Sequence, residues 1–123
     1  MGEGLVGIHS MVGGLVVVAF IIVVILAAIQ ASGGNSQWTR MASFVAAGLL
    51  AVQYILGVLL LGGGATNTVT HYLIGLLVIV PVALQHTAVK RISEQSRGMI
   101  TVIWALAAAF LTVIAYLSGL WRI

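Results

Sequence analysis

The sequence lacks cysteine and aspartate, and its 123 residues include only two glutamates, five lysines or arginines and one proline. Without cysteine the chain cannot form disulfides, iron–sulfur clusters or covalently attached c-type haem. Without aspartate, Ser-His-Asp catalysis is excluded, and no hydrolytic acid pair is expected, because Glu3 lies near the terminus and Glu94 in a predicted loop. Charged residues make up 6% of the chain and apolar residues 62%, whereas soluble domains carry about 25% charged residues. The composition therefore predicts an integral membrane protein, and the net charge of +3 reflects its topology, with no nucleic-acid partner expected.

The few charges divide the chain into uncharged segments of 36, 49 and 24 residues, at 4–39, 41–89 and 98–121. A helix crosses the hydrocarbon core with about 20 apolar residues. The first and third segments therefore accommodate one span each, and the second accommodates two, divided by the turn-like run 62–68. We predict one all-α domain over 1–123, an up-down antiparallel bundle of four transmembrane helices. The spans are expected at about 5–31, 41–61, 70–89 and 98–120.

The positive charges predict the orientation of this bundle. The first and third loops are expected to carry four cations, Arg40, Lys90, Arg91 and Arg97, with Glu94 in the third loop and only Arg122 on the opposite side. The positive-inside rule then places both loops in the cytoplasm and both termini outside, in a prokaryotic cytoplasmic membrane. Aromatic residues are expected at the outer interface (Tyr72, Tyr116, Trp121) and at the inner interface (Trp38).

Small residues and one proline shape the predicted spans. Six glycines fall within them and favour close helix packing: Gly13, Gly14, Gly48, Gly57, Gly75 and Gly119. Pro81 lies in the middle of the third span and is expected to bend it, because proline cannot donate the helical hydrogen bond.

Ionisable side chains inside a membrane are candidates for function, and only histidines remain in this role. His9 and His71 lie in the first turns of the first and third spans, which run in the same direction in an up-down bundle. Each is followed four residues later by a glycine, Gly13 or Gly75, on the same helix face. The two spans are diagonal in the expected bundle. The pattern therefore predicts a slot for a flat cofactor between two imidazoles.

Haem b suits this pair, because two axial imidazoles give a six-coordinate iron suited to electron transfer. Zinc and calcium are disfavoured by the scarcity of carboxylates and the absence of thiols. The haem propionates would face the outer side, where Arg122 is the only cation and is our first candidate to bind them. The other outer donors are Ser10, Thr66, Asn67, Thr68 and Thr70. A role of Arg122 as a simple interface anchor stays open.

The arrangement resembles one four-helix half of haem A synthase and, more loosely, other small bis-histidine b-type membrane cytochromes. The segment Gln53–Gly57 followed by His71 resembles the Gln-x-x-Leu-Gly and downstream histidine pattern of that family. The resemblance implies that His9 and His71 are axial haem ligands, and it carries over nothing catalytic. Val6 and Ser10 replace the acidic and basic residues that flank the family's first ligand. The resemblance therefore extends to haem binding and not to haem A synthesis.

His86 lies near the cytoplasmic end of the third span. A second haem there is disfavoured, because only methionines remain as its other ligand near the inner face, Met41 and Met99. Two alternatives stay open for His86. It lines a quinone headgroup site with Gln30 and Gln85, or it is an interfacial histidine beside Lys90.

These features favour a single-haem b-type cytochrome that transfers electrons, with quinone as a candidate partner, over a stand-alone enzyme. Two other classes stay open. One is a cofactor-free accessory or assembly subunit, because glycine-rich apolar bundles often serve only to pack. The other is a chlorophyll- or bacteriochlorophyll-binding subunit, in which each histidine holds its own magnesium. The absence of an extramembrane domain suits membership in a respiratory or photosynthetic complex or a homo-oligomer.

Overall fold

The computed structural model describes residues 2–87 and 93–122. Its elements are α1 (Gly2–Ala31), α2 (Ser36–Gly62), α3 (Val69–Leu77), α4 (Ile79–Thr87) and α5 (Glu94–Trp121). They provide four segments long and apolar enough to cross a membrane, Glu3–Ala31, Ser36–Gly62, Val69–Thr87 and Gln95–Trp121. The predicted all-helical protein with four membrane-spanning segments is therefore confirmed.

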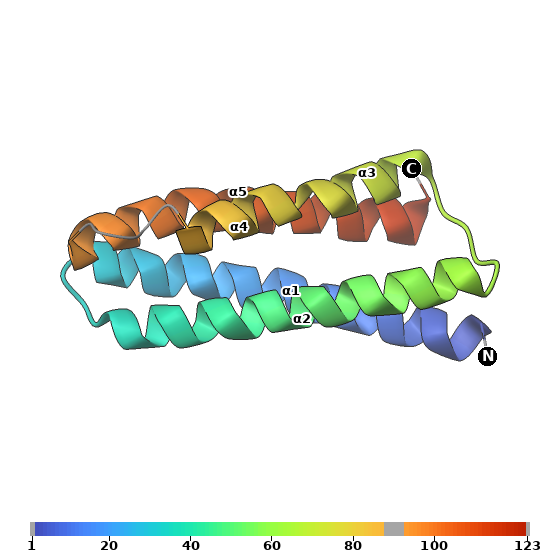
Figure 1. Cartoon of the computed structure of the whole chain (residues 1–123), viewed down its shortest axis with the longest axis horizontal. Coiled ribbons are helices and arrows are strands. Elements are labelled where there is room, and N and C mark those ends of the chain that lie inside the picture. The colour runs from blue at the N-terminus through green and yellow to red at the C-terminus, as the bar shows by residue number, and fades with distance from the viewer. Residues whose placement is uncertain (1, 88–92, 123) are drawn as a thin grey trace.

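The four spans lie side by side in one bundle (Figure 1). The chain runs away from its N-terminus in α1 and returns in α2, and the two termini lie at the same end of the bundle. Helix α1 packs against α2 and α5, while α3 and α4 pack against α5. The first and third spans therefore lie diagonally, with α2 and α5 between them. Lys90 and Arg91, which we expected in the third loop, are outside the described residues.

Helices α2 and α5 begin well before their predicted starts at 41 and 98, because side-chain caps start them before the apolar runs begin. Helix α2 begins at Ser36, since the side chain of Asn35 accepts a hydrogen bond from the Gln37 amide at 2.7 Å. Helix α5 begins at Glu94, since the Ser93 hydroxyl accepts from the Ser96 amide at 3.2 Å. Three charged residues that we expected in loops are therefore helical, Arg40, Glu94 and Arg97. Absence of charge marks the hydrocarbon core, whereas a helix continues into the polar interface.

The third span is interrupted where Pro81 predicts a bend. Helix α3 ends at Leu77 and α4 begins at Ile79, with Val78 between them. Pro81 has no amide proton for the carbonyl four residues earlier, which belongs to Leu77. The helix is therefore interrupted one turn before the proline, at Val78, whose backbone keeps helical dihedral angles.

The core lies between α1 and the other spans. Val16, Phe20 and Val23 of α1 are almost fully buried and follow a three- and four-residue spacing on one face. Ala105 and Ala108 of α5 are fully buried, and such small side chains let two helices approach closely. The many exposed Leu, Ile, Val and Phe side chains form the outer surface of the bundle, which suits contact with lipid.

The closest approach of α1 and α5 yields a test of this packing. A Cβ atom at Gly98 would lie 2.5 Å from the backbone nitrogen of Ala31, so the two helices would have to separate. We expect Gly98→Ala to destabilise the bundle by about 1–3 kcal/mol through overpacking. Thermal unfolding in detergent, followed by circular dichroism, measures the change.

Gly48→Ala is the matched control, because a Cβ atom there meets nothing within 4 Å. Alanine favours the helix by up to about 1 kcal/mol relative to glycine, so this variant should be as stable as the parent or slightly more. Equal melting temperatures for Gly98→Ala and Gly48→Ala would contradict the described contact of α1 with α5.

Candidate functional site

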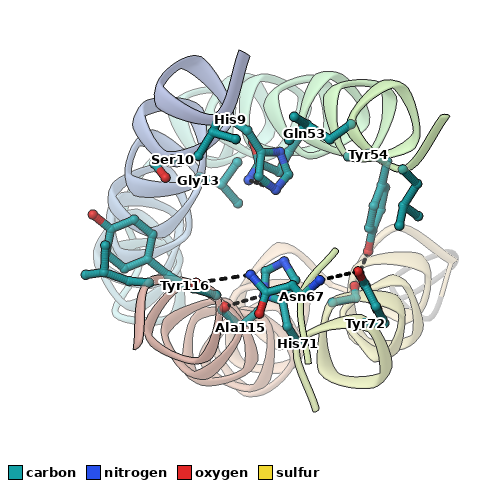
Figure 2. A pocket seen from close by; sticks show the side chains of 18 of the residues that line it. His9, Ser10, Gly13, Gln53, Tyr54, Asn67, His71, Tyr72, Ala115 and Tyr116 are labelled. Carbon is teal, nitrogen blue, oxygen red and sulfur yellow. Dashed lines mark hydrogen bonds between the residues drawn. The ribbon is translucent and has the colours of Figure 1, made fainter. Parts of the chain in front are cut away.

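A cavity of about 510 Å³ opens between the spans at the end of the bundle where the termini lie. Its volume is within the range of about 300–1,000 Å³ that is typical of ligand and cofactor pockets. Figure 2 shows helices surrounding this space and side chains reaching into it. All five site residues predicted from the sequence line it: His9, Gly13, His71, Gly75 and Arg122.

The two imidazoles face each other across this cavity. His9 comes from α1 and His71 from α3, and Figure 2 shows their rings pointing toward one another. The ring centroids are 6.2 Å apart, and the ring planes are inclined at 80°. A metal–imidazole nitrogen bond is about 2 Å long, so two imidazoles on one metal have centroids roughly 6 Å apart. The observed spacing is therefore compatible with a single metal atom shared by both rings.

The hydrogen bond of His71 defines its tautomer. Its Nδ1 lies 2.8 Å from the carbonyl oxygen of Ala115 on α5, and a carbonyl can only accept. Nδ1 therefore carries the proton, and Nε2 is left as the nitrogen with the lone pair. Histidines that ligate metals usually have this arrangement, in which the other ring nitrogen donates to a carbonyl or carboxylate.

His9 has an incomplete set of hydrogen bonds. Its Nε2 lies 3.4 Å from Nε2 of Gln53 on α2, whereas its Nδ1 is buried and has no partner among the described residues. Oε1 of Gln53 is also buried and unpartnered within the same part of the chain. Unpaired buried polar atoms cost about 1–3 kcal/mol each. A ligand at this position would relieve that cost.

Glycines on the neighbouring helices give the two rings their space. A Cβ atom at Gly57 of α2 would lie 3.4 Å from Cε1 of His9, and one at Gly119 of α5 would lie 2.7 Å from Cε1 and Nδ1 of His71. The glycines that follow each histidine in sequence act differently. Gly13 makes room for Gln53, whose Nε2 would be 2.9 Å from a Cβ atom, and Gly75 faces open space.

Sequence analysis missed the roles of several polar residues around the cavity. The Tyr54 hydroxyl donates a hydrogen bond to the carbonyl of Gly75 and so joins α2 to α3. Tyr72, which we expected at the interface, lines the cavity, and its hydroxyl accepts a hydrogen bond from the Asn67 amide. The Asn67 side chain also donates to the carbonyl of Gly119 at 3.1 Å. The two bonds of Asn67 therefore tie the loop between α2 and α3 to both α3 and α5.

The predicted outer donors divide into two groups. Arg122 is exposed and lines the cavity, together with Ser10, Thr66 and Asn67. Among the described lining residues, Arg122 alone carries a charge. Thr68 has a structural role instead, because its hydroxyl caps α3 by accepting from the His71 amide at 3.3 Å. Thr70 is an exposed residue of the same helix.

His86 lies at a second cavity, of about 220 Å³, at the opposite end of the bundle. Gln30 and Gln85 line the same cavity, as the quinone hypothesis requires. The two methionines considered as ligands for a second haem, Met41 and Met99, expose 51% and 57% of their surface. Lys90, the other neighbour expected for His86, falls in the part of the chain that the structure does not describe.

Within residues 2–87 and 93–122, no three His, Cys, Asp or Glu side chains are grouped so that they could hold a metal ion. A metal in the larger cavity would therefore depend on the two histidines and on further ligands that it brings itself. Comparisons with protein-family models, curated proteins and solved structures find no significant match to this chain. Its function is therefore inferred from its own residues.

The contact of Gly119 with His71 can be tested directly. We expect Gly119→Ala to displace the imidazole and to weaken its hydrogen bond to the Ala115 carbonyl. Such a bond is worth about 0.5–1.5 kcal/mol, so the preference for the Nδ1–H tautomer should fall by up to about tenfold. Nitrogen-15 NMR of histidine-labelled protein in micelles measures this preference.

Gly14→Ala serves as the control, because its Cβ atom would meet only Tyr116, at an ordinary 3.8 Å. Its His71 signals should match those of the parent. If the His71 signals of Gly119→Ala also matched, the contact of α5 with the imidazole would be wrong.

Proposed function

We propose that this chain is an integral-membrane b-type cytochrome that binds one haem between His9 and His71 and transfers electrons. The observation that carries the proposal is the opposition of two imidazoles from diagonal spans at a centroid distance of 6.2 Å. The cavity around them is of cofactor size. The unpartnered Nδ1 of His9 supports the same conclusion, since this side chain lacks a partner that a ligand would supply.

The chain's own residues would hold the cofactor as follows. His71 offers Nε2, with its ring fixed by the carbonyl of Ala115. His9 offers a ring nitrogen from the opposite side, with Gln53 beside it. Gly75, whose Cβ position is open, leaves the cavity clear next to His71.

Haem held by two imidazoles supplies an iron that accepts and releases single electrons and has no free position for oxygen. Apolar side chains such as Val6, Val16 and Leu50 line the cavity and give the cofactor an apolar wall. The guanidinium of Arg122, with the hydroxyl of Ser10 and the amide of Asn67, provides donors for carboxylates at the cavity mouth.

We propose an orientation with both termini outside the cell, so that the haem site lies in the outer leaflet. Arg40 and Arg97, at the opposite end of the bundle, then lie on the cytoplasmic side. A quinol or quinone dissolved in the membrane is the electron partner we favour. The alternative electron partners are a neighbouring subunit of a respiratory complex and a second copy of the chain, since either would contact the bundle within the lipid bilayer.

The visible spectrum of the purified protein tests haem binding. We expect sharp α-bands after reduction with dithionite, as low-spin haem b gives. His9→Ala and His71→Ala should each abolish these bands, because each removes one axial ligand. His86→Ala is the matched control and should keep them, because His86 lies at the other end of the bundle. Loss of the bands in His86→Ala alone would overturn the assignment of the ligands.

Gly75→Leu distinguishes loss of bound haem from loss of the folded bundle. The new side chain would enter the open cavity while both histidines remain, so haem uptake should fall and the helical circular dichroism should persist. Near-infrared bands in the parent protein would instead indicate bacteriochlorophyll. A colourless parent that does not take up added haem would favour a cofactor-free subunit.

Arg122→Gln tests the predicted contact with haem carboxylates. Hydrogen bonds to charged groups contribute about 1.5–3 kcal/mol, so haem affinity should fall about tenfold or more, while the low-spin spectrum is kept. Titration of the apoprotein with haem measures the affinity. Arg97→Gln, at the other end of the bundle, is the control and should bind haem as the parent does. Unchanged affinity in Arg122→Gln would favour its role as an interface anchor.

A further inference from the structure

The second cavity, at the end of the bundle opposite the termini, is lined by polar residues from every span. Its lining consists of Gln30, Ser36, Thr39, Arg40, Ser43, Phe44, Gln85, His86, Arg97 and Thr101. This composition contrasts with the largely apolar wall of the larger cavity. Gln85 and Thr39 are only 3% and 4% exposed. Burying such polar side chains costs free energy unless they are hydrogen-bonded.

Three of these side chains have buried polar atoms without a partner in the described part of the chain: Oγ1 of Thr39, Oε1 of Gln85 and Nε2 of His86. They come from α2 and α4 and line one cavity. Most buried polar side-chain atoms in proteins are hydrogen-bonded. Three such atoms around one space therefore indicate a ligand that supplies their partners.

The existing hydrogen bonds show what kind of partner is missing. Nε2 of Gln85 donates to the Ser43 hydroxyl at 2.8 Å, so Oε1 is an acceptor. Nδ1 of His86 lies 2.9 Å from the carbonyl of Val82 and donates to it, so in the neutral imidazole Nε2 is also an acceptor. The missing ligand is therefore a donor, such as a hydroxyl group. An ionised phosphodiester, as in a lipid headgroup, has only acceptor oxygens and does not satisfy these two atoms.

The rest of the lining suits a flat ring with a second oxygen. Arg40 and Arg97 bring donors to the same cavity, so an oxygen on the far side of the ligand finds a partner. The ring of Phe44 lies 5.7 Å from that of His86, at 47°, and provides an aromatic wall. Phe44 is 64% exposed, so this wall of the cavity reaches the lipid-facing surface. An apolar tail would leave the cavity there.

We propose that this second cavity binds the headgroup of a quinol, with one hydroxyl donating to His86 or Gln85 and the isoprenoid tail in the lipid. A quinol has two para hydroxyls, so one can donate to an acceptor while the other meets an arginine, and a volume of about 220 Å³ suits a single substituted ring. The site rests on the proposed function for its role in electron transfer. Its binding test is independent of haem.

The test is titration of the parent protein, in nanodiscs of uncharged phosphatidylcholine, with decylubiquinol and separately with the oxidised decylubiquinone. We expect saturable binding of the quinol and at least tenfold weaker binding of the quinone, which cannot donate to the two acceptors. This comparison needs no substitution, so it does not depend on how well variants fold.

Two substitutions locate the site. His86→Ala and the nearly isosteric Thr39→Val should each raise the Kd for the quinol about tenfold, because each removes a hydrogen-bonding partner. Thr87→Val is the matched control, since Thr87 follows His86 in α4 but is exposed and bonds only to the Ala83 carbonyl of its own helix. It should bind the quinol as the parent does.

Several results would overturn the proposal: no saturable binding of the quinol, equal affinity for quinone and quinol, or unchanged affinity in both His86→Ala and Thr39→Val. Saturable binding of phosphatidylglycerol that is lost in Arg97→Gln, with no quinol binding, would identify an anionic lipid site instead. The haem spectrum of the same samples separates the two proposals. Quinol binding without haem contradicts the proposed function, and haem without quinol binding contradicts only this site.

Discussion

The constraint on which this structure depends is that hydrocarbon offers no hydrogen-bonding partner to a buried polar group. Most of the helical surface is apolar, and the centre of the bundle is packed with residues such as Val16, Phe20 and Ala105. The intramembrane histidines and glutamines lie instead around two cavities, one at each end of the bundle. The polar side chains of the bundle are therefore concentrated at the two ends of an otherwise apolar core.

Because the chain has almost no carboxylates to orient its imidazoles, backbone carbonyls take that role. His71 donates through Nδ1 to Ala115 of a neighbouring helix, and His86 donates through Nδ1 to Val82 of its own helix. In both cases Nε2 is left as the lone-pair nitrogen at the cavity. In our two proposals, the same device prepares His71 to bind a metal and His86 to accept a hydrogen bond from a hydroxyl.

The sequence predicted the spans well because the cost of burying charge decides where a helix crosses. The break before Pro81 was predictable for an equally local reason. The rotation of each helix about its own axis was not predictable from the sequence, since it depends on how the surfaces of the four spans fit together. For that reason Gly57 and Gly119 were assigned to general packing, although they lie against His9 and His71. The early starts of α2 and α5 were missed because polar caps, not apolar runs, begin those helices.

The geometry also discriminates among the functions that the sequence left open. Two pigments, each with its own magnesium and its own histidine, need two macrocycles, whereas ring centroids 6.2 Å apart leave room for only one between them. A purely structural bundle would pair its polar groups with each other, yet Nδ1 of His9 and Oε1 of Gln53 are buried without partners among the described residues. Each unpaired buried atom lowers the stability of the bundle, and a purely structural subunit would gain nothing in return. A shared cofactor accounts for the close approach of the histidines and for the unpaired nitrogen of His9, so it is the hypothesis that the physical chemistry favours.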